Sequence, residues 1–251
     1  MYCHLCGQAR KLIKAHIIPE AFFVAHRKDG KRPSRLISNC KGERAKKSPV
    51  GIYDFNILCG ECDGKLGLWD EYGIQLFIKD LKSFAPSPVT GTPICFVRPE
   101  FDYVKLKLFV LSVLWRAHLT SQKFFERVQL GPYADALRDM IAMSDPGDGD
   151  DFCTVLSCFT LADQLEMKAL PILDPHRERW QHVNAYRLGF GVLTAYVKVD
   201  QSKFGPSFRD VSLRPDQPLI VIQRSYEQSS ERRLGGAIVG AKQNRQIFDR
   251  E

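Results

Sequence analysis

The sequence predicts an α+β protein in which a small ββα module held by a metal ion precedes a mixed α+β domain. Three observations point to this architecture. Two Cys-x-x-Cys pairs, Cys3/Cys6 and Cys59/Cys62, enclose an alternating segment and a switch to helical spacing. The stretch 83–100 holds four prolines and no helical period, which predicts a linker. After it, helical spacing gives way to runs of β-branched and aromatic residues, which are typical of strands.

Residues 1–82 are predicted to form the metal module. A first strand is expected near Leu12–Ile18, followed by a short helix over 20–27. Aromatic and aliphatic residues alternate over 51–59, which predicts a second strand. Over 61–81 the apolar residues recur every three or four positions, which predicts a helix.

The two Cys-x-x-Cys pairs predict a structural zinc site. Four thiolates are the number that a tetrahedral zinc ion requires, and Gly7 permits a tight turn after the first pair. A strand-borne pair joined to a helix-opening pair is typical of a treble clef. The other cysteines lack such partners, and we expect them to be buried thiols. They are Cys40, Cys95, Cys153 and Cys158.

The composition is that of a soluble globular protein, with 44% hydrophobic and 26% charged residues. No run of 18 apolar residues occurs, so we expect no membrane span. The chain opens directly on the first cysteine pair, which leaves no room for a signal peptide. We therefore expect a cytoplasmic protein whose cysteine pairs bind metal rather than form disulfides.

Positive charge is concentrated between the cysteine pairs. The segment 26–47 carries nine Lys or Arg side chains against two acidic ones, while the whole chain has a net charge of +7. Such a patch suits a polyanion, although a solvated loop has the same composition. We predict that it binds nucleic acid, DNA before RNA. The residues concerned are Arg27, Lys28, Lys31, Arg32, Arg35, Lys41, Arg44, Lys46 and Lys47.

The segments "CHLCG", "AHIIPEAF" and "NILCGECDGKLG", which span residues 3 to about 73, resemble the HNH endonucleases with their ββα-metal fold. The resemblance implies metal-dependent hydrolysis of a nucleic-acid phosphodiester. It places His16 as the general base and implies that Asp54 or Asn56 steadies its ring. It also implies that Asp63, with Asp54 or Asn56, holds a catalytic Mg²⁺ or Mn²⁺. An imidazole with a pKa near 6.5 can take a proton from water at neutral pH, which fits this role.

Two positions depart from the family pattern. Ala15 stands where the family often has a metal ligand, and Asp63 stands where it usually has a histidine. Asp63 can bind a hard cation, or it can be a carboxylate that faces the start of a helix. Glu20 and Glu71 are possible substitutes for the missing ligand. The alternative is therefore a non-catalytic module that binds nucleic acid or protein around a degenerate site.

Residues 101–251 are predicted to form the second domain, for target recognition, partner contact or homo-oligomer assembly. Phe101–Leu119 and Ser121–Met143 have helical spacing. Extensions of this kind behind an HNH module point to defence against foreign DNA. Strands are predicted over 152–161, 186–199 and 218–225.

Overall fold

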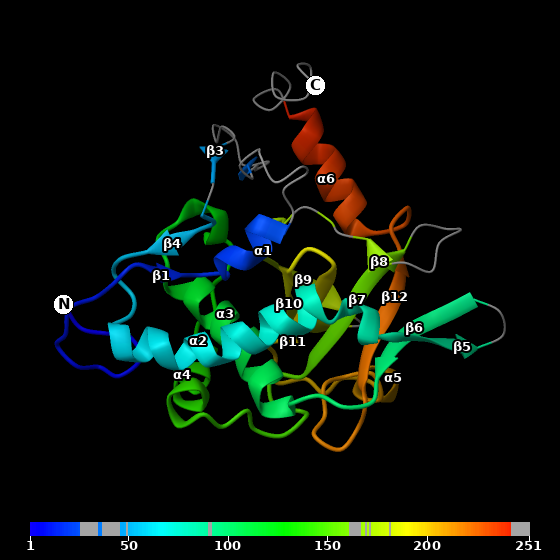
Figure 1. Cartoon of the computed structure of the whole chain (residues 1–251), viewed down its shortest axis with the longest axis horizontal. Coiled ribbons are helices and arrows are strands. Elements are labelled where there is room, and N and C mark those ends of the chain that lie inside the picture. The colour runs from blue at the N-terminus through cyan, green and yellow to red at the C-terminus, as the bar shows by residue number, and fades with distance from the viewer. Residues whose placement is uncertain are drawn as a thin grey trace.

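The computed structural model describes residues 1–25, 35–36, 46–48, 50–89, 92–160, 167–168, 170, 172–180 and 182–241. Within these ranges the chain is a mixed α+β protein, with a large mixed sheet and several helices (Figure 1). The helices are α1 (Glu20–Ala25), α2 (Gly60–Ile74), α3 (Tyr103–Leu119), α4 (Tyr133–Met143), α5 (Pro206–Arg209) and α6 (Ser230–Gly240). None of the helices described is both long and apolar enough to cross a membrane.

The strands form one large sheet and two short ladders. Among the described residues, the large sheet has the strand order β5-β6-β12-β7-β11-β10-β9, with β8 paired to β7, and its one parallel pair is β12–β7. The ladders are β1 with β4 and β2 with β3. The strands are β1 (Ala15–His16), β2 (Arg35–Leu36), β3 (Lys46–Lys47), β4 (Tyr53–Asp54), β5 (Ala85–Val89), β6 (Thr92–Arg98), β7 (Thr154–Thr160), β8 (Met167–Lys168), β9 (His176–Trp180), β10 (Val183–Gly189), β11 (Leu193–Lys198) and β12 (Leu219–Ser225).

The predicted elements of the N-terminal segment are present but shorter than expected. β1 and β4 pair over two residues each, and a separate bridge joins Leu12 to Cys59. The predicted helix over 61–81 appears as α2, which continues into a π-helical turn over Gln75–Lys79 and a 3₁₀ turn over Leu81–Ser83. The helical spacing therefore predicted α2 correctly. The two predicted strands are reduced to the two residues of β1 and the two of β4 that pair.

The expectation of a linker over 83–100 is wrong in its local structure. This segment contains β5 and β6, which form a hairpin at one end of the large sheet. Its prolines are compatible with strands because of where they lie. Pro86 and Pro88 are on the edge strand β5, which needs hydrogen bonds on one side only. Pro93 precedes the part of β6 that pairs with β12.

The second half contains the predicted strands and one helix that is shorter than predicted. The runs over 152–161, 186–199 and 218–225 form β7, β10 with β11, and β12. The helix expected over Ser121–Met143 begins only at Tyr133, after an irregular segment with one 3₁₀ turn. α3 is confirmed and is buried along almost its whole length, so it is a central helix of the core.

The two predicted units share one hydrophobic core, although their division stays a prediction. Four phenylalanines from distant parts of the chain pack together, with ring centroids 5.1 to 6.4 Å apart. They are Phe22, Phe77, Phe109 and Phe190. α2 approaches α3 closely at Gly73, where an added Cβ would lie 2.6 Å from the Phe109 ring. The N-terminal segment is thereby held against the sheet and its central helix.

Candidate functional site

The four cysteines of the two pairs form a cluster close enough to bind a metal ion. Their sulfur atoms all lie within 4.8 Å of one another. Cys3 and Cys6 lie in a turn that ends at Gly7, whose φ of 68° favours glycine. Cys59 caps the N-terminus of α2 and Cys62 lies in its first turn. The turn and the helix start therefore bring the two pairs together.

The chemistry of this cluster fits a thiolate-binding metal such as zinc. Burial opposes ionisation of Cys3, but hydrogen bonds from the backbone of Cys6, Cys59 and Leu5 lower its pKa to about 7. The Cys59 amide lies 3.4 Å from the Cys3 sulfur. Burial and the neighbouring sulfurs raise the pKa of Cys62. One thiol is thus prepared as a thiolate, and a bound cation would stabilise the charge of the others.

His16 lies on β1, in the chain segment between the two cysteine pairs. About a quarter of its side chain is exposed, but the Nε2 atom is shielded and has no hydrogen-bond partner among the described residues. The carboxylate oxygen Oε2 of Glu20, in the first turn of α1, is 3.8 Å from Nε2. An unpaired buried nitrogen is rare in folded proteins and requires an explanation such as catalysis or ion binding.

Burial lowers the pKa of His16, and the positive charge of Lys14 lowers it further. The charges of Glu20 and Asp63 and a backbone hydrogen bond at Val50 act in the opposite direction. The balance keeps the pKa below its usual value of about 6.5, so the ring is neutral at pH 7. A neutral imidazole with a free nitrogen is the form that can accept a proton.

Asp54 does not face His16, contrary to the expectation that it would steady the ring. In the antiparallel pair, His16 lies opposite Tyr53 and Asp54 lies opposite Ala15. Opposed residues share a face, so Asp54 and His16 project to opposite faces. The Asp54 carboxylate is buried and accepts hydrogen bonds from Thr120 Oγ1 at 2.7 Å and from the Asn56 amide at 2.9 Å. Asp54 is a structural residue in this arrangement.

Asn56 and Glu71, the other residues considered for the site, are exposed. Asp63 is the predicted residue that remains near His16, since its charge raises the pKa of the imidazole. It lies in the first turn of α2, where burial raises its own pKa and the charge of Arg116 lowers it. The described residues hold no second group of three or more ligands close enough for a metal. A catalytic ion at His16 would therefore have to draw carboxylates such as that of Asp63 closer together when it binds.

Arg116 is a residue of this region whose role was not predicted from the sequence. It is 1% exposed and lies on α3. Its guanidinium donates to both carboxylate oxygens of Asp70, at 2.6 and 2.9 Å, and to the carbonyl oxygen of His16 at 2.8 Å. α3 therefore fixes the backbone of His16 against α2. No local pattern identifies this contact, because its partners are 46 and 100 residues away.

The predicted nucleic-acid-binding residues lie outside the described residues, except that the backbones of Arg35, Lys46 and Lys47 are described. Arg35 of β2 pairs with Lys47 of β3, so this basic segment contains a short antiparallel ladder. Binding by this segment stays a prediction.

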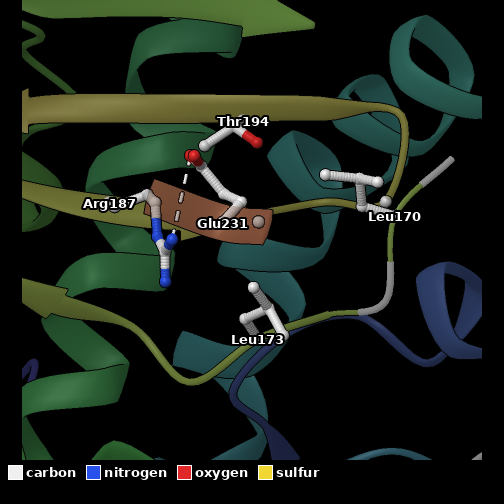
Figure 2. Close-up of a pocket in the computed structure, with 7 residues that line it drawn as sticks. Leu170, Leu173, Arg187, Thr194 and Glu231 are labelled. Carbon is white, nitrogen blue, oxygen red and sulfur yellow. Dashed lines mark ion pairs between the residues drawn. The ribbon is translucent and has the colours of Figure 1, made fainter. Parts of the chain in front are cut away.

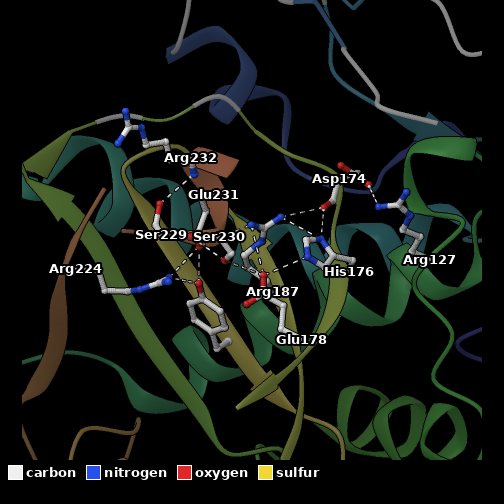
Figure 3. Close-up of polar contacts among 11 residues, drawn as sticks. Arg127, Asp174, His176, Glu178, Arg187, Arg224, Ser229, Ser230, Glu231 and Arg232 are labelled. Atoms are coloured by element: carbon white, nitrogen blue, oxygen red, sulfur yellow. Dashed lines mark hydrogen bonds and ion pairs between the residues drawn. The ribbon is translucent and has the colours of Figure 1, made fainter. Parts of the chain in front are cut away.

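A buried charge cluster lies on the large sheet at the start of α6 (Figure 3). Glu231 is 3% exposed and accepts hydrogen bonds from Tyr196 at 2.5 Å and Arg224 at 2.9 Å. Arg187 lies 3.7 Å from Glu231 and 3.6 Å from Glu178. These contacts attach the first turn of α6 to the sheet.

The hollow beside this cluster is too small for a substrate. Arg187, Glu231 and Thr194 line it together with Leu170 and Leu173 (Figure 2). The free space suits about one water molecule. We therefore assign this cluster a structural role and place the candidate site at His16.

Comparison with known proteins adds no family assignment, since no family model, no curated protein and no solved structure matches the chain.

Proposed function

We propose that this protein is a metal-dependent endonuclease of the HNH type that hydrolyses phosphodiester bonds of nucleic acid, with DNA as the main substrate. The observation that carries the proposal is the shielded, unpaired Nε2 of His16, on a strand that lies between the two cysteine pairs in the sequence. The β1–β4 ladder and the Arg116 hydrogen bond to its carbonyl oxygen hold the histidine in position. The unpaired Nε2 atom can accept a proton, which is the chemistry that a general base requires.

In this proposal His16 accepts a proton from the attacking water. Its lowered pKa keeps the ring neutral at pH 7, so Nε2 has a lone pair available. The Arg116 hydrogen bond to the carbonyl oxygen of His16 limits movement of the strand that carries the ring. Substrate binding has to open a path for water to Nε2, because that atom is shielded from solvent.

Asp63 and Glu20 are the carboxylates that would hold a catalytic Mg²⁺ or Mn²⁺. Glu20 lies 3.8 Å from Nε2, and the Asp63 charge acts on the same ring. A bound divalent cation would neutralise charge on the phosphate and on the leaving oxygen. Oxygen ligands suit these hard cations. Asp54 has no part in this set, since its carboxylate bonds to Thr120 on the opposite face.

The test is cleavage of plasmid DNA and of RNA with Mg²⁺ or Mn²⁺, with the parent and His16→Ala compared. We expect a loss of at least about a hundredfold in rate for His16→Ala, because a general base contributes about 10²–10⁴. The matched control is His182→Asn, which changes an exposed histidine with a positive φ and should leave cleavage unchanged. Equal cleavage by parent and His16→Ala would disprove the proposed role.

The same experiment separates the alternative function, a non-catalytic module that binds nucleic acid. The observation in its favour is that the described residues form no second metal-ligand group around His16. If no protein cleaves and all bind DNA equally, with weaker binding at higher salt, the binding module is correct. If salt-sensitive binding is also absent, a protein-interaction role is correct.

A further inference from the structure

Four side chains with chemistry suited to a nucleotide lie together at the β1–β4 ladder. His16 and Tyr53 are opposed in the ladder, so their side chains share one of its faces. Lys14 and Phe55 lie just outside the paired residues, and both contact the Tyr53 ring. The ring centroids of His16 and Tyr53 are 6.1 Å apart, and those of Tyr53 and Phe55 are 5.4 Å apart.

This face is open rather than part of the core. Phe55 is 56% exposed, which is unusual for a phenylalanine, and Lys14 is exposed. The Lys14 ammonium lies 4.3 Å from the centroid of the Tyr53 ring. The lysine is therefore held beside the aromatic pair by a cation–π contact. The exposed Phe55 ring, the Lys14 ammonium and the His16 imidazole thus each contact the Tyr53 ring.

We propose that Phe55, Tyr53 and Lys14 form a binding platform for an unpaired nucleotide next to His16. The nucleobase stacks on the exposed Phe55 ring, and Lys14 binds a neighbouring phosphate. In a duplex each base is already stacked, so its face is closed to the platform. The substrate of this site is accordingly single-stranded nucleic acid, or a junction or end with unpaired nucleotides. Cleavage of the bound strand rests on the proposed nuclease function. Binding of the unpaired nucleotide does not depend on it.

The test is equilibrium binding of fluorescent 12-nucleotide oligomers in the His16→Ala background, so that no cleavage is required. Single-stranded DNA, single-stranded RNA and duplex DNA are compared. We expect Phe55→Ala to weaken binding of a single strand by about tenfold or more and to leave duplex binding unchanged. Phe55→Trp should retain single-strand binding, and oligomer should quench the fluorescence of the introduced indole. The RNA arm shows whether the sugar matters.

The matched control is Leu68→Ala, which removes another exposed apolar side chain, 63% exposed on α2. It should bind all three oligomers as the His16→Ala parent does. Unchanged single-strand binding by Phe55→Ala, an equal loss for duplex, or no single-strand binding by the parent would each overturn the platform. If the platform holds but the protein with His16 intact cleaves nothing, the nuclease proposal fails on its own.

Discussion

At the scale of single residues, the pleat of one short ladder decides which side chains belong to the candidate site. Asp54 follows Tyr53 on β4, and period-2 alternation turns its side chain to the other face of the strand. The pairing of His16 with Tyr53 puts that face on the far side from the histidine. A shift of register by one residue would have reversed the assignment.

Asp54→Ala tests this structural role. The substitution leaves the Thr120 hydroxyl and the amides of Asn56 and Ser121 without their acceptor. We expect the free energy of unfolding to fall by about 2 kcal/mol, because buried donors lose their partner. Urea denaturation measures this change. The control Asn56→Ala removes an exposed side chain and should change stability by less than about 0.5 kcal/mol.

At the scale of elements, the cysteine cluster joins a turn at the N-terminus to the start of α2. The Cys59→Ser variant removes one thiolate from it. We expect the bound zinc to fall from about one ion per chain and the unfolding free energy to drop by more than about 4 kcal/mol. Elemental analysis and thermal unfolding measure the two effects.

The control for the metal site is Cys153→Ser, which changes a buried cysteine outside the cluster. Cys153 has no cysteine of the cluster close enough to share a metal ion with it. This variant should keep its zinc. Unchanged zinc content and unchanged stability in Cys59→Ser would show that Cys59 is not a ligand of the metal ion.

The Arg116–Asp70 pair joins α3 to α2 and to β1, and it provides a second test at this scale. Arg116→Met leaves the Asp70 carboxylate and the His16 carbonyl oxygen without their donor. We expect a loss of about 3–5 kcal/mol in unfolding free energy, and a smaller loss in the double variant Arg116→Met/Asp70→Leu. Denaturant unfolding of both variants checks this order. Arg138→Ala, at an exposed ion pair on α4, should have no measurable effect.

At the scale of the whole molecule, the charge cluster under α6 links stability to pH. Burial alone would raise the pKa of Glu231, but the hydrogen bond from Tyr196 and the charge of Arg224 hold it below its usual value. A carboxyl whose pKa is lower in the folded state stabilises the fold above its unfolded pKa. That contribution is lost as the pH falls through the folded pKa.

We therefore expect the unfolding free energy to be steady near neutral pH and to decrease as the pH falls below about 4.5. Glu231→Gln should be less stable at pH 7 and show a shallower decrease in acid. Urea unfolding at a series of pH values measures both. The exposed Glu100→Gln variant should follow the parent, and a steep parent-like decrease in Glu231→Gln would contradict the assignment.

Local patterns predicted a substantial part of this fold. The helical spacing after Cys59 predicted α2, and the buried apolar stripe around Phe109 predicted α3. The linker predicted over 83–100 was wrong in its local structure, because a proline-rich composition is shared by edge strands and linkers. β9, with its charged sequence, carried no strand signal at all. The hydrogen bonds of its antiparallel pairing with β10 hold this segment in the extended conformation that its own residues do not indicate.

The sequence by itself determined the four cysteines that lie close enough to bind a metal ion, and the histidine between them in the chain, because two ligands in one turn need only a short fixed spacing. The tertiary structure alone decided that Asp54 turns away from His16, that Arg116 holds its strand, and that Phe55 stands exposed beside it. Register and contacts between residues 46 to 100 positions apart are set by how the elements pack. Spacing along the chain does not encode them, so no local pattern can supply them.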